Sequence, residues 1–182
     1  GVRPEEINYV MCTHLHVDHV GWNTINRDGA WVPTFPNARY VFAETEFEFW
    51  RAARDNADPA TFNLVNNKTF DDSVLPVMAL AQLVQGETEL IADQLRVSPA
   101  PGHTPGSITI SLTDAGAEAL FTGDILHHPI QVYEPGWNSA YCEMPEQAIA
   151  TRRNVLSHCA EHGTLMMPAH FGPSFAGTVV DR

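Results

Sequence analysis

Four side chains that can bind metal ions lie close together near the start of the chain. The segment "HLHVDH" contains His14, His16, Asp18 and His19. Neutral imidazole and carboxylate are the groups that hold zinc, iron or manganese ions in proteins. The H-x-H spacing lets two imidazoles leave one segment toward one ion, and the Asp-His pair can point to a second position. By composition alone such a run arises by chance in on the order of one chain in a thousand. The segment therefore predicts a metal site.

Three more ligand-type side chains follow apolar runs later in the chain. His103 lies in "SPAPGHTPG", Asp124 ends "LFTGD", and His170 lies in "MMPAHFG". Each of them alone has an ordinary explanation as a loop histidine or a turn aspartate. Together with the first segment, they mark four places where an apolar strand passes into a loop that contains Gly or Pro. We therefore expect four strand ends to bring these donors to one site along the edge of a sheet structure.

Apolar runs rich in β-formers predict the strands that carry these ligands. The expected strands are "INYVMC" (7–12), "RYVFA" (39–43), "DQLRVSPA" (93–100), "SITISLT" (107–113), "EALFTG" (118–123) and "TLMMPA" (164–169). The clearest helix covers 145–162, because Pro145 stands at its first position and Gly163 follows its last residue.

Further helices are expected between the second and third of these strands. Thr45 and Glu48 match a capping box that would open the helix "EFEFWRAARDNA" (46–57). Residues 58–69 have loop composition, and a second helix is expected from about Asp71 to just before Gly86. No repeat, low-complexity segment or linker interrupts the pattern, so we expect one α/β domain over residues 1–182.

Charge and cysteine content exclude some classes of partner. The chain has 10 basic and 22 acidic residues, a net charge of −12, and no basic stripe, which disfavours nucleic acid. No apolar run approaches the length of a membrane span. Cys12, Cys142 and Cys159 form no C-x-x-C pair, which is typical of reduced thiols. These features indicate a cytoplasmic protein without a nucleic-acid or membrane partner. Gly1 is not a natural initiator, so a signal peptide ahead of it stays open.

The combined motifs resemble those of the metallo-β-lactamase superfamily, whose signature is H-x-H-x-D-H, a distal His, a bridging Asp and a last His. The matching segments are "HLHVDH", "PGHTPGS", "FTGD" and "PAHF". The resemblance implies an αββα sandwich and two divalent metal ions, with zinc expected and iron or manganese as alternatives. It implies that the first ion binds His14, His16 and His103, that the second binds Asp18, His19 and His170, and that Asp124 bridges both.

The resemblance also implies more chain ahead of the first motif. Members of the superfamily normally have several strands before the first His motif, whereas only 13 residues precede His14. We therefore expect a domain truncated at its N-terminus, and a natural protein longer by roughly 80–110 residues. An open sheet in such a fragment would favour a homodimer or coverage by a partner chain.

Asp124 narrows the choice within the superfamily. True β-lactamases of this fold usually have Cys or Ser there, so penicillin hydrolysis is not expected. The pattern is similar to glyoxalase-II-like thioesterases, acyl-homoserine lactonases and methyl-parathion-hydrolase-like enzymes. The segment "GDILHHPIQVYEPGW" is closer to the lactonase and organophosphate-hydrolase branch. The implied reaction is attack by a hydroxide bridged between two metal ions on an ester, lactone or phosphotriester.

The candidate catalytic residues are Asp18 and His127. His127 follows Asp124 by three positions and could hydrogen-bond the oxyanion or protonate the leaving group. Lactonases of this fold often use a Tyr from a similar position, so His127 departs from that pattern, and His128 is an equal candidate.

Aromatic residues are candidates for a substrate pocket: Trp22, Phe47, Trp50, Tyr133 and Trp137. Phe47 and Trp50 have helical spacing, which favours packing into the core instead. Two other functions on the same fold stay open. One is a non-haem iron oxidoreductase such as a persulfide dioxygenase, and the other is a tRNA-processing-type nuclease, which the acidic balance disfavours.

Overall fold

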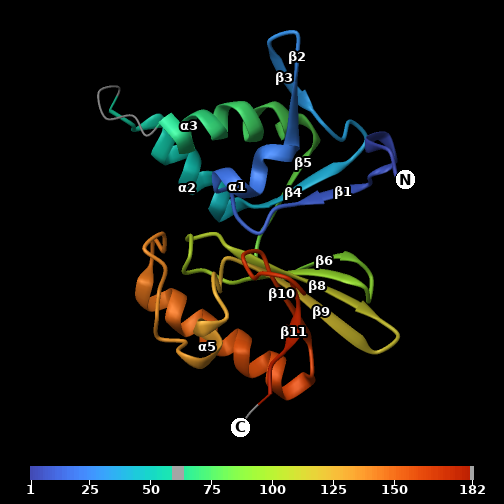
Figure 1. Cartoon of the computed structure of the whole chain (residues 1–182). Helices are drawn as coiled ribbons and strands as arrows, with labels where there is room; N and C mark the ends of the chain where they lie inside the picture. The colour runs from blue at the N-terminus through green and yellow to red at the C-terminus, as the bar shows by residue number, and fades with distance from the viewer. Residues whose placement is uncertain (59–63, 181–182) are drawn as a thin grey trace. The chain divides into compact units, whose positions relative to one another are not determined.

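The computed structural model describes residues 1–58 and 64–180 (Figure 1). The chain forms two compact units, Gly1–Val84 (unit 1) and Gln85–Arg182 (unit 2). Each unit contains both sheet and helix, which confirms the predicted α/β class. Among the described residues, the model contains no helix with the length and apolar character needed to span a membrane. The expectation of one domain over residues 1–182 stays a prediction.

Unit 1 is built on a three-stranded parallel sheet with the order β1-β4-β5. The strands of unit 1 as a whole are β1 (Tyr9–Met11), β2 (Thr24–Arg27), β3 (Ala30–Pro33), β4 (Arg39–Ala43) and β5 (Ala81–Val84), of which β2 and β3 form a separate hairpin. Its α-helices are α1 (Val17–Val20), α2 (Glu44–Asp55) and α3 (Leu64–Thr69). Short 3₁₀ turns cover Pro4–Glu6, Gly21–Asn23 and Leu75–Leu80, and a π-helical turn covers Phe70–Val74.

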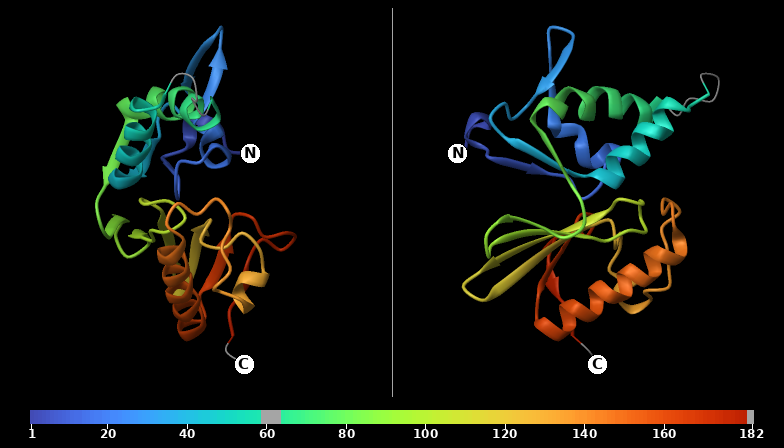
Figure 2. Two further views of the ribbon diagram at one scale, coloured as in Figure 1. Left: turned by 90° about the vertical axis from the view of Figure 1, so that its left-hand side faces the viewer. Right: turned by 180° about the vertical axis from the view of Figure 1, so that it is seen from behind.

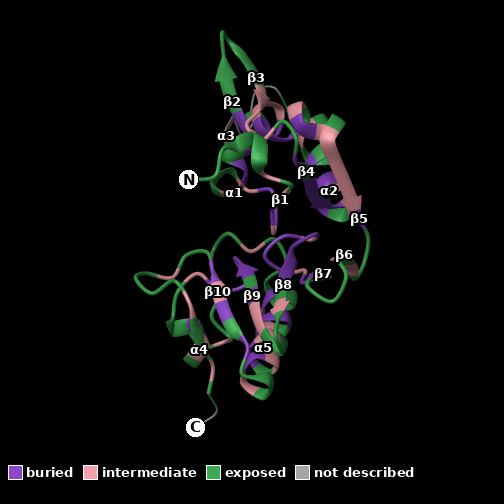
Figure 3. Cartoon of the chain, turned by 90° about the vertical axis from the view of Figure 1, so that its right-hand side faces the viewer, coloured by how far each residue is buried: buried purple, intermediate pink, exposed green. Residues whose placement is uncertain are grey.

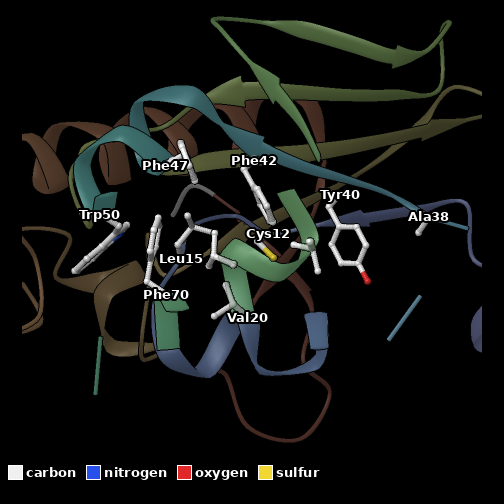
Figure 4. Packing of buried hydrophobic residues seen from close by; sticks show 11 residues of the cluster. Cys12, Leu15, Val20, Ala38, Tyr40, Phe42, Phe47, Trp50 and Phe70 are labelled. Carbon is white, nitrogen blue, oxygen red and sulfur yellow. The ribbon is translucent and has the colours of Figure 1, made fainter. Parts of the chain in front are cut away.

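The core of unit 1 lies between its sheet and its helices. Strand β4 reads "RYVFA", and its last four residues are buried, as expected for a central strand of aromatic and β-branched residues. Figure 4 shows Phe47, Trp50 and Phe70 beside Leu15 in this cluster. Burying a side chain of this size contributes about 1.5–3 kcal/mol. The cluster thereby fixes Leu15, which lies inside the His-rich segment.

A two-stranded hairpin, β2–β3, extends from unit 1. Arg27 pairs with Ala30 across a two-residue loop, and both loop residues, Asp28 and Gly29, have positive φ. Asp-Gly is the sequence typical of such a turn, because its twist matches that of the strands. The β2 strand of the hairpin is mostly exposed (Figure 3).

Unit 2 contains a six-stranded sheet with the order β11-β10-β9-β8-β7-β6. Its strands are β6 (Thr88–Ile91), β7 (Leu95–Pro99), β8 (Ile108–Asp114), β9 (Ala117–Gly123), β10 (Leu165–Pro168) and β11 (Gly177–Thr178). Its α-helices are α4 (Ile130–Tyr133) and α5 (Pro145–His162). Strands β6 to β9 are antiparallel neighbours, whereas β9 and β10 are parallel, with α5 between them in sequence (Figure 2).

Helix α5 covers one face of the unit 2 sheet. Leu156 and Cys159 of α5 are buried in one cluster with Leu120 of β9 and Met166 of β10. The helix ends at Gly163, which adopts the left-handed conformation that favours glycine. The bounds predicted for this helix are confirmed.

The structure corrects several sequence predictions in unit 1. Helix α2 begins at Glu44 with Ala43 as N-cap and no side-chain cap, so the capping box of Thr45 and Glu48 is wrong. The segment predicted as loop over 58–69 contains α3 from residue 64, and its residues 59–63 lie outside the described residues. The helix predicted to reach Gly86 ends earlier, and β5 follows it.

Candidate metal centre

The four ligand-type residues of the first motif gather in one group within unit 1. They follow β1, and His16 is the N-cap of α1, the short helix that contains Asp18 and His19. His14 Nε2 lies 3.1 Å from His16 Nδ1, and the rings of His14 and His19 have centroids 4.0 Å apart. His19 Nε2 lies 3.5 Å from Asp18 Oδ2. We call these four residues the unit 1 donor group.

Neighbouring side chains hold this group in position. The Thr13 hydroxyl lies 3.2 Å from His14 Nδ1, so the tautomer with its proton on Nδ1 keeps the Nε2 lone pair for a metal. Glu46 of α2, which is buried, accepts hydrogen bonds from the backbone N–H of Leu15 at 2.9 Å and from Trp50 Nε1 at 2.7 Å. The Trp50 ring in turn meets the His16 ring edge-on, with centroids 5.2 Å apart.

A second group of donors surrounds the carboxylate of Asp124 in unit 2. Asp124 Oδ2 lies 3.4 Å from His103 Nε2, 3.1 Å from His127 Nε2 and 3.0 Å from His170 Nε2. The Asp124 side chain is only 4 % exposed. We call Asp124 and these three histidines the unit 2 donor group. One buried carboxylate oxygen thus meets three imidazoles, one of which the seven-ligand pattern did not include.

The ends of three sequence segments bring the unit 2 donor group together. Asp124 directly follows β9, and His170 lies two residues after the end of β10. Between β10 and His170, Ala169 donates its N–H to the carbonyl of Gly123, the last residue of β9, at 3.2 Å. His103 lies on a loop fixed to the start of α5, because Glu143 N–H donates to the His103 carbonyl at 2.9 Å. Because β9 and β10 pair in parallel, Asp124 and His170, which are 46 positions apart in sequence, meet at the same end of the two strands.

Gly102 makes the close approach of this loop to α5 geometrically feasible. Its φ is +143°, and a Cβ atom there would lie 2.4 Å from the Ala148 Cα atom. Only glycine fits such a backbone conformation and such a contact without strain. The glycine-containing turn predicted beside His103 is therefore confirmed.

The structure separates the roles of His127 and His128. His128 is exposed, and its Nδ1 accepts the N–H of Ile130 at 3.1 Å. His127 faces Asp124, and its buried Nδ1 has no hydrogen-bond partner among the described residues. An ionised carboxylate can only accept hydrogen bonds, so the short contact with Asp124 Oδ2 favours a ring proton on Nε2 of His127. In that form His127 is a hydrogen-bond donor to Asp124.

The unit 2 donor group has the chemistry that a metal ion needs. Imidazole nitrogen and carboxylate oxygen suit zinc, iron and manganese, and the donor atoms of His103, Asp124 and His127 lie within 4.8 Å of one another. Cysteine, the typical ligand of closed structural zinc sites, is not among them. The residues therefore fit a metal ion that keeps a coordination position for other ligands.

Residues 1–161 match the family model described as the Metallo-beta-lactamase superfamily. The chain belongs to this superfamily. The resemblance inferred from the motifs is thereby confirmed.

Among curated superfamily members, the chain is similar to the N-acyl homoserine lactonase of Bacillus thuringiensis. The two are 26 % identical over 125 residues, which cover 68 % of this chain and 40 % of that lactonase. The match thus spans less than half of the length of that curated relative.

Solved structures of superfamily proteins share the fold of the whole chain. The hydrolase AbOPH is 25 % identical, with a TM-score of 0.86 over 100 % of this chain and 63 % of its own. AidC, described as a dizinc quorum-quenching lactonase, is 19 % identical, with a TM-score of 0.86 and the same coverage. A probable metal-dependent hydrolase from Staphylococcus aureus is 22 % identical, with a TM-score of 0.83 over 100 % of this chain and 61 % of its own. These likenesses confirm the predicted fold class.

The aromatic residues proposed for a pocket divide into two classes. Phe47 and Trp50 are buried in the core of unit 1, as their helical spacing indicated. Trp22, Tyr133 and Trp137 are exposed, the last by 60 %. Only these three remain candidates for contact with a substrate.

Proposed function

We propose that this chain is the metal-binding part of a hydrolase that cleaves a small ester, lactone or phosphotriester. The observation that carries the proposal is the buried Asp124 carboxylate with three imidazole Nε2 atoms within 3.4 Å. The Bacillus N-acyl homoserine lactonase, to which the chain is similar, supports a small-molecule substrate with an acyl centre, and the hydrolase AbOPH supports hydrolysis. A phosphoryl centre is the alternative that the sequence motifs leave open.

The superfamily pattern assigns seven ligands to two divalent ions, for which we propose zinc. The ligands are His14, His16, Asp18, His19, His103, Asp124 and His170. When bound, such ions polarise the substrate and activate water near neutral pH. The protein orients the ligands through Thr13 and Glu46 in unit 1 and through the His103 loop in unit 2.

His127 is the residue that we propose to act on the substrate itself. Its Nε2–H, 3.1 Å from Asp124 Oδ2, is placed to donate a hydrogen bond to a substrate oxygen beside that carboxylate. In the imidazolium form, the same proton would pass to the oxygen of the leaving group as the bond to it breaks, and a neutral ring would remain. Asp18 is proposed as an acidic ligand that balances the charge of the metal ions.

The test is a hydrolysis panel of lactones, thioesters, aryl esters and phosphotriesters on zinc-reconstituted protein, with metal content measured in parallel. We expect activity on at least one class. Asp124→Asn and His14→Ala should lose at least about a hundredfold in kcat/KM together with bound zinc. His128→Gln is the matched control, because this exposed histidine accepts the N–H of Ile130 in its own loop.

Two results would contradict the proposal. Full activity in both ligand variants would show that the assigned residues are not the metal site. Iron that stays bound during purification, with redox-dependent spectra and no hydrolysis, would instead favour the oxidoreductase alternative.

A further inference from the structure

The loop that follows Asp124 is fixed by two buried polar side chains. This loop, His127–Asn138, carries His127 at its start and Trp137 near its end, and it includes α4. Gln131 of α4 is only 4 % exposed and Arg152 of α5 is fully buried. Buried polar groups persist only where hydrogen bonds satisfy them, so the partners of these two side chains show what they hold.

Gln131 connects the two ends of the loop. Its Oε1 accepts the backbone N–H of His127 at 2.6 Å and that of His128 at 3.2 Å. Its Nε2 donates to the Trp137 carbonyl at 2.8 Å. Because two N–H donors face one side of the amide and a carbonyl acceptor faces the other, the partners determine that the oxygen points to His127 and the nitrogen to Trp137.

Arg152 holds the same loop from α5. Its Nε donates to the Ile125 carbonyl at 2.8 Å, and its Nη1 donates to the carbonyls of Pro135 at 2.7 Å and Trp137 at 2.9 Å. Its Nη2 donates to Asn138 Oδ1 at 3.1 Å. Burial lowers the pKa of Arg152 from its ordinary value, and nearby Cys142 opposes that shift. Four neutral acceptors thus solvate the guanidinium in place of water.

The Trp137 carbonyl joins the two side chains, because both Gln131 and Arg152 donate to it. The loop is therefore fixed at His127, at Pro135 and at Trp137, and Arg152 also holds Ile125, two residues before the loop begins. A histidine has only two side-chain torsions, so a fixed backbone N–H at His127 leaves its ring few positions. One of these puts Nε2 at 3.1 Å from Asp124 Oδ2.

We infer that Gln131 is a positioning residue, which Arg152 supports, and that it sets the direction of the His127 Nε2–H toward the Asp124 carboxylate. The effect of Gln131 on catalysis rests on the proposed function, whereas its effect on the position of His127 does not. General acid and oxyanion groups lose most of their effect when displaced by about an ångström. Loss of the Gln131 bonds should therefore weaken His127 without removing any metal ligand.

Two variants of Gln131 separate its contacts. Gln131→Met keeps the length of the side chain but removes both the acceptor and the donor. Gln131→Glu keeps an acceptor for the N–H groups of His127 and His128 and loses the donor to Trp137. Gln147→Met is the matched control, because Gln147 is an exposed glutamine of α5 whose Nε2 donates to Thr151 of the same helix. Zinc content is measured for each variant.

The expected kinetic result is specific to a group that acts through His127. Gln131→Met should lower kcat about tenfold for substrates with a poor leaving group, with little change in KM. Gln131→Glu should recover most of that loss. In a His127→Gln background, Gln131→Met should add less than about twofold. An equal loss in both backgrounds would mean that Gln131 serves the fold alone and would overturn the inference.

A measurement without activity distinguishes this inference from the proposed function. In ¹⁵N-edited NMR spectra of the full chain, the ring signals of His127, assigned with His127→Gln, should move in Gln131→Met and stay in Gln147→Met. If the protein hydrolyses nothing and these signals move, the proposed function fails and the positioning role stands. Unchanged His127 signals in Gln131→Met would overturn the positioning role whatever the activity.

Discussion

The Glu46 carboxylate accepts the backbone N–H of Leu15, the residue between His14 and His16, at 2.9 Å. The same oxygen, Oε1, accepts Trp50 Nε1 at 2.7 Å. A buried acid on α2 therefore fixes the centre of the H-x-H segment, and it does so through the backbone rather than through either imidazole. This contact links the folding of unit 1 to the geometry of its donor group.

Replacement of Glu46 should destabilise the protein and disturb this segment. Glu46→Ala leaves two buried N–H groups without an acceptor, each of which costs about 1–3 kcal/mol. We expect a loss of about 3 kcal/mol in the free energy of unfolding, measured with urea, and weaker zinc binding. Glu48, on the same helix, has its side chain 44 % exposed, and Glu48→Ala should change stability by less than about 0.5 kcal/mol. Equal effects of the two changes would contradict the role of Glu46.

Gly102→Ala should be among the most damaging single-methyl changes in unit 2. The new Cβ would lie 2.4 Å from Ala148 Cα and 2.5 Å from Ala148 N, and both are backbone atoms that cannot rotate away. We expect a loss of more than about 2 kcal/mol, measured by thermal unfolding, with weaker metal affinity because His103 is the next residue. Gly172→Ala, with open space at its Cβ, should stay near the parent. A stable Gly102→Ala protein with normal zinc affinity would show that the loop is not held as described.

Bound zinc should stabilise the folded chain, and removal of Asp124 should abolish that effect. At a free zinc concentration of a hundred times Kd, a ligand that binds only the folded state contributes about 2.7 kcal/mol. We expect a chelator to lower the Tm of the zinc-loaded protein and to leave Asp124→Asn unchanged. A chelator effect of the same size in Asp124→Asn would place the stabilising ion elsewhere.

The stability of unit 2 should fall at acid pH partly through Glu118. Burial raises the pKa of this carboxyl, but hydrogen bonds from Thr164 at 2.7 Å and His158 at 2.9 Å outweigh it, so the pKa lies below its ordinary value of 4.5. A lowered pKa contributes stability that is present above 4.5 and is lost as the pH falls through the folded-state value. Glu118→Gln should therefore show a shallower loss of unfolding free energy below pH 4.5. An unchanged slope would mean that other carboxyls govern acid unfolding.

The three thiols should react with a disulfide reagent at very different rates. Burial raises the pKa of Cys12 to about 12 and that of Cys159 to about 11. At pH 8 their thiolate fractions are then on the order of one in ten thousand and one in a thousand. Cys142 is half-buried, so we expect it to react first in the folded protein. Cys142→Ser should remove the fast phase, and a fast phase that survives would contradict the burial of the other two.

Local sequence indicated several of the elements and most of the donors. Strand β4 and helix α5 follow from apolar runs and from Pro and Gly at the helix ends. The donors of "HLHVDH" gather because they are near neighbours on one turn after β1. Asp-Gly between β-rich runs is also typical of a hairpin turn, and the hairpin at Asp28-Gly29 is an element that was not predicted above.

Tertiary structure alone decided which buried polar residues support the site. Glu46 lies 31 positions from Leu15, and Arg152 lies 27 positions from Ile125. Most of their partners are backbone groups, which every residue carries, so no residue type in the sequence marks these contacts. The place of His127 against Asp124 likewise depends on the amide of Gln131 and on the packing of α5. Motif spacing can identify ligands because metals select side-chain types, whereas the hydrogen bonds that orient those ligands exist only once distant segments meet.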